Sequence, residues 1–128
     1  MIKKEVITGE GIPKSHLPFS PGVIAGDFVF ISGQASVDEN GKIVNESFAG
    51  ECRRSFENVR KILTAAGLDF PDVVQVRNYV GKQEDLAEFN QIYREYFSAP
   101  FPARTTLIGC LGELLKFEVD VIAIKRKT

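Results

Sequence analysis

The sequence predicts a single domain of the α+β class, in which two helices cover one face of a β-sheet. Three observations support this prediction. The chain has 128 residues, the length of one ordinary domain, with 44% hydrophobic and 26% charged residues, the proportions of a folded chain. No repeat, low-complexity segment or linker divides it, so we treat residues 1–128 as one domain. The apolar period changes from strand-like to helical at Ser47, and strand and helix patterns alternate from there.

Strands are expected in the N-terminal third of the chain. The segment "VIAGDFVFISGQ", Val23 to Gln34, is rich in β-branched and aromatic residues and predicts a strand. Asn40 and Gly41 stand between "SVDE" and "KIV", and this pair favours a two-residue hairpin turn because both central residues must accept positive φ. The early strands are therefore expected to pair as hairpins.

The first helix is predicted from Ser47, a plausible N-cap, to Gly67, a plausible left-handed residue after the C-terminus. Its apolar face is formed by residues spaced three and four apart, namely Phe48, Cys52, Phe56, Val59, Leu63 and Ala66. Asp72 to Gly81 alternates as a strand. A second helix follows with an apolar side that ends before Pro100 and Pro102; this side comprises Leu86, Phe89, Ile92, Tyr93, Tyr96 and Phe97.

The last two strands are predicted in "RTTLIGCL" and "LLKFEVDVIAI", which gives the order β-β-β-α-β-α-β-β. In the final segment, apolar residues alternate with Lys116, Glu118 and Asp120. Since two helices can cover only one face of such a sheet, the other face would present both apolar residues and acids. That face suits an interface between copies of the chain that holds a polar pocket.

Composition excludes several classes of function. Sixteen basic and seventeen acidic residues leave a net charge of -1, so neither nucleic acid nor an anionic membrane is expected as a partner. Cys52 and Cys110 lie far apart without a C-x-x-C pair, which indicates neither a disulfide framework nor a zinc site. The opening "MIKKEVITGEG" has no apolar stretch of the secretory type, and no uncharged run reaches transmembrane length. A cytoplasmic location is expected.

Motifs for phosphate, dinucleotide and triad chemistry are absent. The sequence contains neither G-x-x-x-x-G-K-[ST] nor G-x-G-x-x-G, and His16 is its only histidine. A Ser-His-Asp triad and a His-paired metal site are therefore not expected. We interpret His16 as a loop residue, and both cysteines as structural.

Arg104 and Glu118 are the leading candidates, with Asp120 beside them. If the last two strands pair with each other, Arg104 and Glu118 can approach across the sheet. One interpretation is a structural ion pair between Arg104 and Glu118 or Asp120. The other is a pocket in which Arg104 binds a substrate carboxylate while Glu118 handles a water molecule.

Five segments resemble the RidA family, also called YjgF or L-PSP. In order along the chain they are "PFSPGVIAGDFVFISGQ" (18–34), "ENVRKILTAAG" (57–67), "FNQIYREYF" (89–97), "FPART" (101–105) and "FEVDVIAI" (117–124). This resemblance implies a chorismate-mutase-like fold with a mixed sheet of about six strands. It also implies a homotrimer with a central barrel-like core and a ligand cleft at each subunit interface.

The resemblance further implies an activity. Deaminating members hydrolyse enamines and imines such as 2-aminoacrylate and 2-iminobutanoate to 2-keto acids and ammonia, without metal or cofactor. On the family pattern Arg104 would bind the carboxylate and Glu118 would position or deprotonate the water. The cleft would be lined by the strand end at Ser32 and Gly33, by Asn90, and by Phe19 and Thr106.

Two positions depart from the pattern of the best-known deaminases. Phe19 stands where those proteins commonly have tyrosine, and Thr106 where they commonly have cysteine. A non-enzymatic, chaperone-like trimer that binds small carboxylates, or a deaminase specialised for aminomuconate or pyrimidine breakdown, are therefore alternatives. The endoribonuclease activity attached to some relatives is disfavoured by the balanced charge and the lack of a histidine pair.

Overall fold

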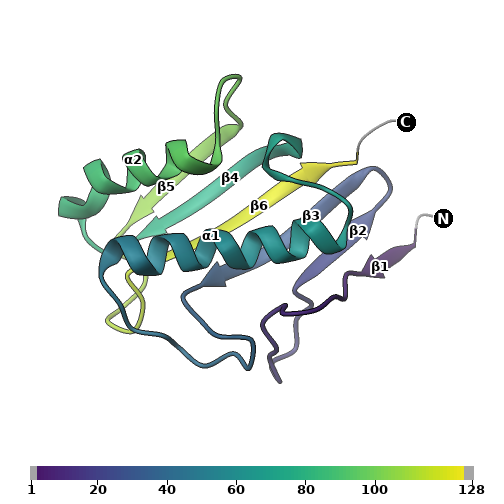
Figure 1. Ribbon diagram of the computed structural model, residues 1–128, viewed down its shortest axis with the longest axis horizontal. Coiled ribbons are helices and arrows are strands. Elements are labelled where there is room, and N and C mark those ends of the chain that lie inside the picture. The colour runs from purple at the N-terminus through teal and green to yellow at the C-terminus, as the bar shows by residue number, and fades with distance from the viewer. Residues whose placement is uncertain (1–2, 126–128) are drawn as a thin grey trace.

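The computed structural model describes residues 3–125, and within this range the chain forms one six-stranded sheet with two helices (Figure 1). The strands are β1 (Lys4–Val6), β2 (Gly22–Ala25), β3 (Phe28–Ala35), β4 (Val73–Val80), β5 (Ala103–Ile108) and β6 (Phe117–Ile124). The helices are α1 (Phe48–Ala65) and α2 (Leu86–Tyr96), with 3₁₀ turns at Phe70–Asp72 and Gln83–Asp85. The spatial order is β1-β2-β3-β6-β4-β5, and only the β4–β5 pair is parallel. The predicted α+β class, with a mixed sheet and both helices on one face, is confirmed.

Helix α1 begins and ends where its sequence predicts. The Ser47 side chain accepts a hydrogen bond from the Gly50 N–H at 3.1 Å, and Gly67 follows the helix with φ of 77°. Cys52, Phe56 and Leu63 are fully buried on the predicted apolar face. Burying one such large side chain stabilises the fold by about 1.5–3 kcal/mol.

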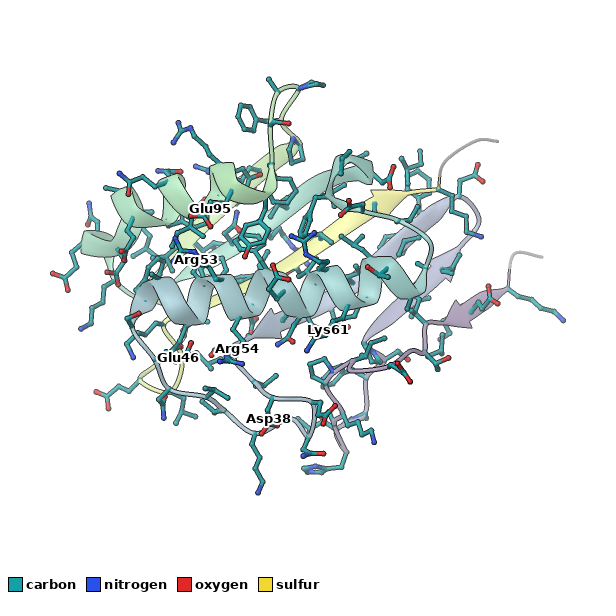
Figure 2. All side chains as sticks on the ribbon, in the orientation of Figure 1. Asp38, Glu46, Arg53, Arg54, Lys61 and Glu95 are labelled. Carbon is teal, nitrogen blue, oxygen red and sulfur yellow. The ribbon has the colours of Figure 1, made fainter. Side chains whose placement is uncertain are left out.

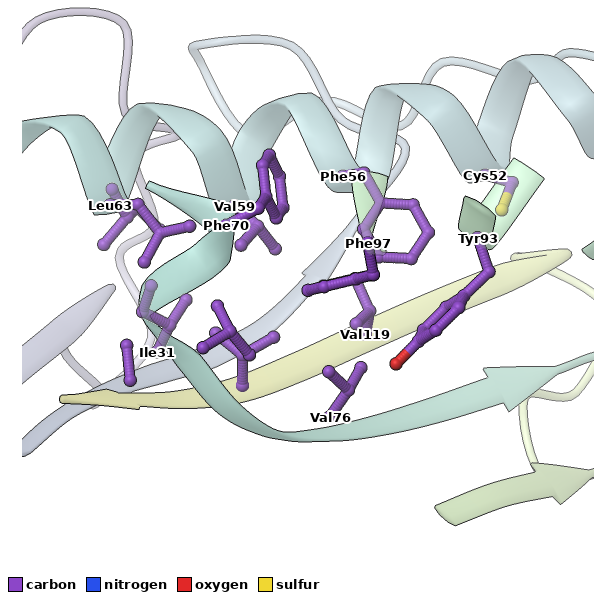
Figure 3. Packing of buried hydrophobic residues seen from close by; sticks show 14 of the residues in the cluster. Ile31, Cys52, Phe56, Val59, Leu63, Phe70, Val76, Tyr93, Phe97 and Val119 are labelled. Carbon is purple, nitrogen blue, oxygen red and sulfur yellow. The ribbon is translucent and has the colours of Figure 1, made fainter. Parts of the chain in front are cut away.

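The core lies between the two helices and the sheet, and Phe56 is at its centre (Figure 3). Its ring packs edge-on against Tyr93 of α2 and lies 5.4 Å from the Phe117 ring of β6. On the outer side, Arg53 of α1 and Glu95 of α2 point toward each other and form a bidentate ion pair at 2.7 and 2.9 Å (Figure 2). These contacts hold α2 close to α1 and to the sheet. None of the helices within residues 3–125 has the length and apolarity required to cross a membrane.

The first strands differ from their predicted bounds. Val23 to Gln34 forms two strands rather than one, because Gly26 has φ of 62° and turns the chain so that Ala25 pairs with Phe28. The predicted two-residue turn at Asn40 and Gly41 is wrong, because only Gly41 of the pair has positive φ and the turn instead runs from Asp38 to Gly41, where the Gly41 N–H donates to the Asp38 carbonyl. Only one bridge, between 37 and 43, flanks it in the described range. The Asp38 carboxylate accepts hydrogen bonds from the N–H groups of residues 40 and 42, and such local bonds compete with a strand ladder.

The last two strands do not pair with each other, contrary to the sequence prediction. Strand β4 lies between them: it pairs in parallel with β5 on one side and antiparallel with β6 on the other. The chain from β4 to β5 runs through α2, and a helical crossover returns the chain parallel to its starting strand. Strand β6 then enters the centre of the sheet, beside β3.

The face of the sheet opposite the helices is uncovered in the single chain. Both helices lie on the same side of the strands in Figure 1. Four large apolar side chains from three strands are exposed on the opposite face, namely Phe28, Phe30, Leu107 and Ile124. Exposed apolar side chains in such number are typical of an interface. Self-association through this face remains a prediction.

Candidate active site

Arg104 lies on the edge strand β5 and its side chain turns toward α2. Its Nη1 donates a hydrogen bond of 2.8 Å to Asn90 Oδ1. The guanidinium carbon lies 4.9 Å from the Tyr93 ring centroid and 5.1 Å from that of Phe89, both in the range of cation–π contacts. No carboxylate within residues 3–125 forms an ion pair with Arg104. The interpretation of Arg104 as a partner of Glu118 or Asp120 within the chain is therefore wrong.

An open cavity of about 400 Å³ adjoins the guanidinium, lined by Asn90, Tyr93, Arg94, Phe101, Pro102 and Arg104. Asn90 is fixed from two sides, because Arg94 Nη1 donates to its backbone carbonyl at 3.2 Å. Two guanidinium groups and apolar walls make this cavity suited to a small anion. Arginine offers five N–H donors, so the hydrogen bond to Asn90 leaves donors for a bidentate contact with a carboxylate.

Glu118 belongs to a second group of predicted site residues, on β3, β6 and the loop before β2. A Cβ atom at Gly33 would lie only 2.8 Å from Glu118 Oε2, so a side chain at this position would displace the end of Glu118. Ser32 is held against the preceding loop, since its hydroxyl donates to the Ser20 carbonyl at 2.6 Å. Phe19 and Gly33 line the same shallow hollow of about 150 Å³.

The pKa of the Glu118 carboxyl is raised above its ordinary value, first by burial and second by the negative charge of Asp120. Asp120 itself accepts hydrogen bonds from Arg77 Nε at 2.9 Å and from the Tyr79 hydroxyl at 2.8 Å. Asp120 is therefore occupied by neighbours within the chain. A carboxyl group whose pKa lies nearer to neutrality is suited to accept and return a proton.

The two groups do not meet within one chain. Alternate residues of β6 place Glu118 on the uncovered face, between the buried Phe117 and Val119. Arg104 pairs in register with the buried Val76, so it points to the helix-covered face, and β4 separates the two strands. The predicted approach of Arg104 to Glu118 across the sheet is wrong. The structure brings Arg104 together with Asn90, and Glu118 together with Gly33.

The remaining sequence candidates have simple structural positions. Cys52 is buried in the core, and burial raises the pKa of its thiol far above the ordinary value, so it is unreactive at neutral pH. Cys110 and His16 are exposed. Two residues of the Arg104 region were missed, Asn78 and Tyr93, whose polar atoms are buried beneath α2. Strand alternation places Asn78 on the same buried face as Val76 and Val80. A polar residue at an alternating apolar position was therefore the signal in the sequence that could have identified it.

Glu118→Gln is expected to stabilise the protein at about pH 8 and to leave its stability unchanged at about pH 4. A raised pKa means that the folded state keeps the proton at pH values where the unfolded chain has released it. The contribution of Glu118 to the free energy of unfolding therefore falls as pH rises from the ordinary carboxyl range through its raised pKa. Glutamine does not titrate, so the Glu118→Gln variant does not have this loss. Unfolding midpoints in urea across this pH range measure the difference, with exposed Glu84→Gln as control. Equal midpoints for wild type and Glu118→Gln at the higher pH would contradict the prediction.

The sequence and the fold of the chain are similar to those of known proteins. The family described as Endoribonuclease L-PSP matches residues 10–125. A RutC family protein of Pyrococcus horikoshii is 38% identical over 124 residues, covering 95% of this chain and 98% of its own. The 2-iminobutanoate/2-iminopropanoate deaminase of Salmonella typhimurium is 35% identical over 126 residues, with the same coverages. The crystal structure of E. coli TdcF with bound serine has a TM-score of 0.85 and 30% identity, covering 95% of this chain and 99% of that one. The chain therefore belongs to the Endoribonuclease L-PSP family, also known as the RidA or YjgF family.

Proposed function

We propose that the protein hydrolyses small 2-imino acids, and the enamines in equilibrium with them, to 2-keto acids and ammonia. The observation that carries this proposal is the Arg104 guanidinium, which Asn90 and two aromatic rings hold beside an open cavity without a carboxylate partner in the described chain. A relative with 35% identity is named 2-iminobutanoate/2-iminopropanoate deaminase, which supports the same substrate class.

The proposed reaction needs orientation and proton transfer more than covalent catalysis. Arg104 binds the substrate carboxylate, which fixes the imine carbon relative to the site. Water adds to that carbon, and Glu118 accepts the proton that the water loses. Glu118 then returns the proton to the nitrogen, which gives a carbinolamine. The carbinolamine hydroxyl transfers its proton by way of Glu118 to the nitrogen as the carbon–nitrogen bond breaks, so ammonia leaves and the oxygen stays as the carbonyl of the 2-keto acid. An imine and one water thus yield a keto acid and ammonia, and no cofactor takes part.

A complete site requires two chains in this proposal. Arg104 and Glu118 belong to opposite faces of the sheet, so Glu118, Gly33, Ser32 and Phe19 of one copy would face Arg104 of the next. A head-to-tail arrangement of unlike surfaces closes into a ring, and we propose a homotrimer formed through the uncovered face. The exposed Phe28 and Phe30 on that face supply the apolar area such an interface buries.

The wild-type protein is expected to accelerate 2-ketobutanoate formation when a threonine dehydratase generates 2-iminobutanoate. Arg104→Ala should lose this acceleration, because the carboxylate then has no fixed cation. Arg53→Ala is the matched control, since Arg53 is paired with Glu95 on the outer surface and lies outside the cavity. Absorbance of the keto acid, followed over time, measures the rate. A wild-type protein that leaves the rate at the uncatalysed value would refute the deaminase proposal.

A second candidate is a trimer that binds small carboxylates without turnover. It is favoured by Phe19, whose ring carries no hydroxyl to donate or relay a proton. Binding of 2-ketobutanoate by calorimetry, together with no acceleration in the coupled assay, would favour it over the deaminase. The endoribonuclease activity in the family's description is not proposed, because the only histidine, His16, is exposed and no second histidine could act with it.

A further inference from the structure

Three buried polar groups beneath α2 have no hydrogen-bond partner among residues 3–125. They are the two amide atoms of Asn78, the Thr106 hydroxyl and the Tyr93 hydroxyl. Asn78 is 0% exposed, and Tyr93 is 4% exposed. A buried polar group without a hydrogen bond loses its solvation without compensation, which destabilises the folded state. Native proteins pair such groups with ordered water where protein partners are lacking.

The three residues converge from three elements. Asn78 of β4 and Thr106 of β5 are direct partners in the parallel register, two residues after the pair of Val76 and Arg104 and therefore on the same face. Figure 3 shows the Tyr93 hydroxyl pointing from α2 toward the sheet. The Tyr93 ring centroid lies 4.9 Å from the guanidinium carbon of Arg104, which precedes Thr106 by two residues on the same face of β5. Asn78 follows Val76 by two residues and is on the same face of the strand. The polar groups therefore surround one site between β4, β5 and α2.

The chemistry of this site fits a single water molecule. The Asn78 amide can both donate and accept, and the Thr106 hydroxyl can do the same. Burial raises the pKa of Tyr93 to about 12, so its hydroxyl keeps its proton and can donate. A buried water is typically held by two to four polar partners, and these three side chains supply that number.

The site also bears on Arg104, because the guanidinium lies over the Tyr93 ring at 4.9 Å. A hydrogen bond from the Tyr93 hydroxyl to a fixed acceptor would set the position of that ring. The ring in turn supports one side of the arginine, while Asn90 holds Nη1. Strand β5 has no neighbour on its outer side in the described chain, so Thr106 offers an additional tie to β4.

We propose that Asn78, Thr106 and Tyr93 bind one internal water molecule, and that this water makes Asn78 a positioning residue for Arg104. The water site stands on the buried polar groups alone. Its consequence for substrate binding rests on the proposed function, in which Arg104 takes the carboxylate.

Stability measurements on shape-conserving variants test the water site. Tyr93→Phe and Thr106→Val each remove a hydroxyl without leaving a large cavity. If the groups share a water, each change lowers the urea midpoint, and the double variant loses less than the sum of the two, because the first change already disrupts the water. If the groups are simply unpaired, each change raises the midpoint instead, and the proposal is overturned. Asn78→Leu is expected to lower the urea midpoint in the same way. If this variant does not fold, Tyr93→Phe and Thr106→Val alone decide between the two outcomes.

A high-resolution crystal structure of the unliganded wild-type protein provides the direct readout. An ordered water within hydrogen-bond distance of the Asn78 amide and at least one of the two hydroxyls is expected. Absence of electron density for a water at this site would overturn the proposal.

The NMR order parameter of the Arg104 Nε–H group measures how far the Arg104 side chain is restricted. This value should fall in Tyr93→Phe and Asn78→Leu while that of Arg53, held by Glu95, stays constant. An unchanged value for Arg104 would remove the positioning role. A protein that holds the water and lacks deaminase activity would refute the proposed function alone.

Discussion

An equal mixture of Arg104→Ala and Glu118→Ala chains is expected to recover about one quarter of wild-type deaminase activity after assembly, and the purified mixed trimers about one third per site, although each variant alone is inactive. Each variant should lose about 100-fold or more, because one lacks the group that orients the substrate and the other lacks the proton acceptor. Recovery follows from the geometry: Arg104 and Glu118 lie on opposite faces of one sheet, with β4 between their strands. Each site in the proposed trimer therefore takes its arginine from one chain and its glutamate from another.

The expected size of the recovery follows from counting interfaces in a three-membered ring. Any trimer that contains both variants has one interface where a native Arg104 meets a native Glu118, one where both are alanine, and one between like chains. Random assembly from equal amounts makes about three quarters of the trimers mixed, and about one third of their sites native, which together give about one quarter.

The measurement uses two differently tagged chains that are expressed together or refolded from a mixture. Trimers carrying both tags are purified and their rate per site is compared with that of the wild type. Mixing Arg104→Ala chains with chains that carry both substitutions is the matched control, since no interface of that mixture is native. A mixture of the single variants that stays as inactive as this control would show that the site does not join two chains in this way.

The helices could be predicted from the sequence, and Arg104 could be selected as a candidate site residue, because their signals are local. Ser47 directly precedes the first residue of α1, and the left-handed Gly67 lies two residues after its last, so each signal marks one end of the helix. Arg104 stood out as a cation at the start of an uncharged run, in a chain without metal, triad or phosphate-loop residues. Patterns of this kind depend on a single turn or a single face of one element.

The strand order could not be predicted in the same way. Whether β6 pairs with β5 or enters beside β3 depends on contacts between residues far apart in the chain, and alternation within β6 is the same in both cases. The consequence for the site was large, because the pairing decides whether Arg104 and Glu118 can meet in one chain. The turn at Gly26 was missed for a simpler reason: a single glycine inside an apolar run resembles a strand residue until its φ of 62° is seen.

Glu51→Ala is expected to lower the free energy of unfolding by about 3–5 kcal/mol, more than any other single change of a charged residue that we predict. Glu51 is 0% exposed, and its carboxylate connects three parts of the fold. Oε1 accepts the Lys116 backbone N–H at 3.0 Å, and Oε2 accepts the Lys116 ammonium at 3.1 Å and the Glu46 N–H at 3.2 Å. Alanine would leave two backbone donors without a partner and open a cavity at the start of α1.

The loss of stability is expected to differ in size between the two partners of the Glu51–Lys116 ion pair. Lys116→Met should cost only about 1 kcal/mol, because its ammonium is half exposed and the two backbone N–H groups still satisfy the carboxylate. Glu57→Ala is the control for a carboxylate on the same helix, since its pair with Arg60 is exposed on the surface. Urea unfolding at one fixed protein concentration measures all three, so that any coupling to assembly is held constant. A loss for Glu51→Ala no greater than that for Glu57→Ala would mean that the loop before β6 finds other partners. In that case the buried carboxylate would not be what ties the start of α1 to the strand that carries Glu118.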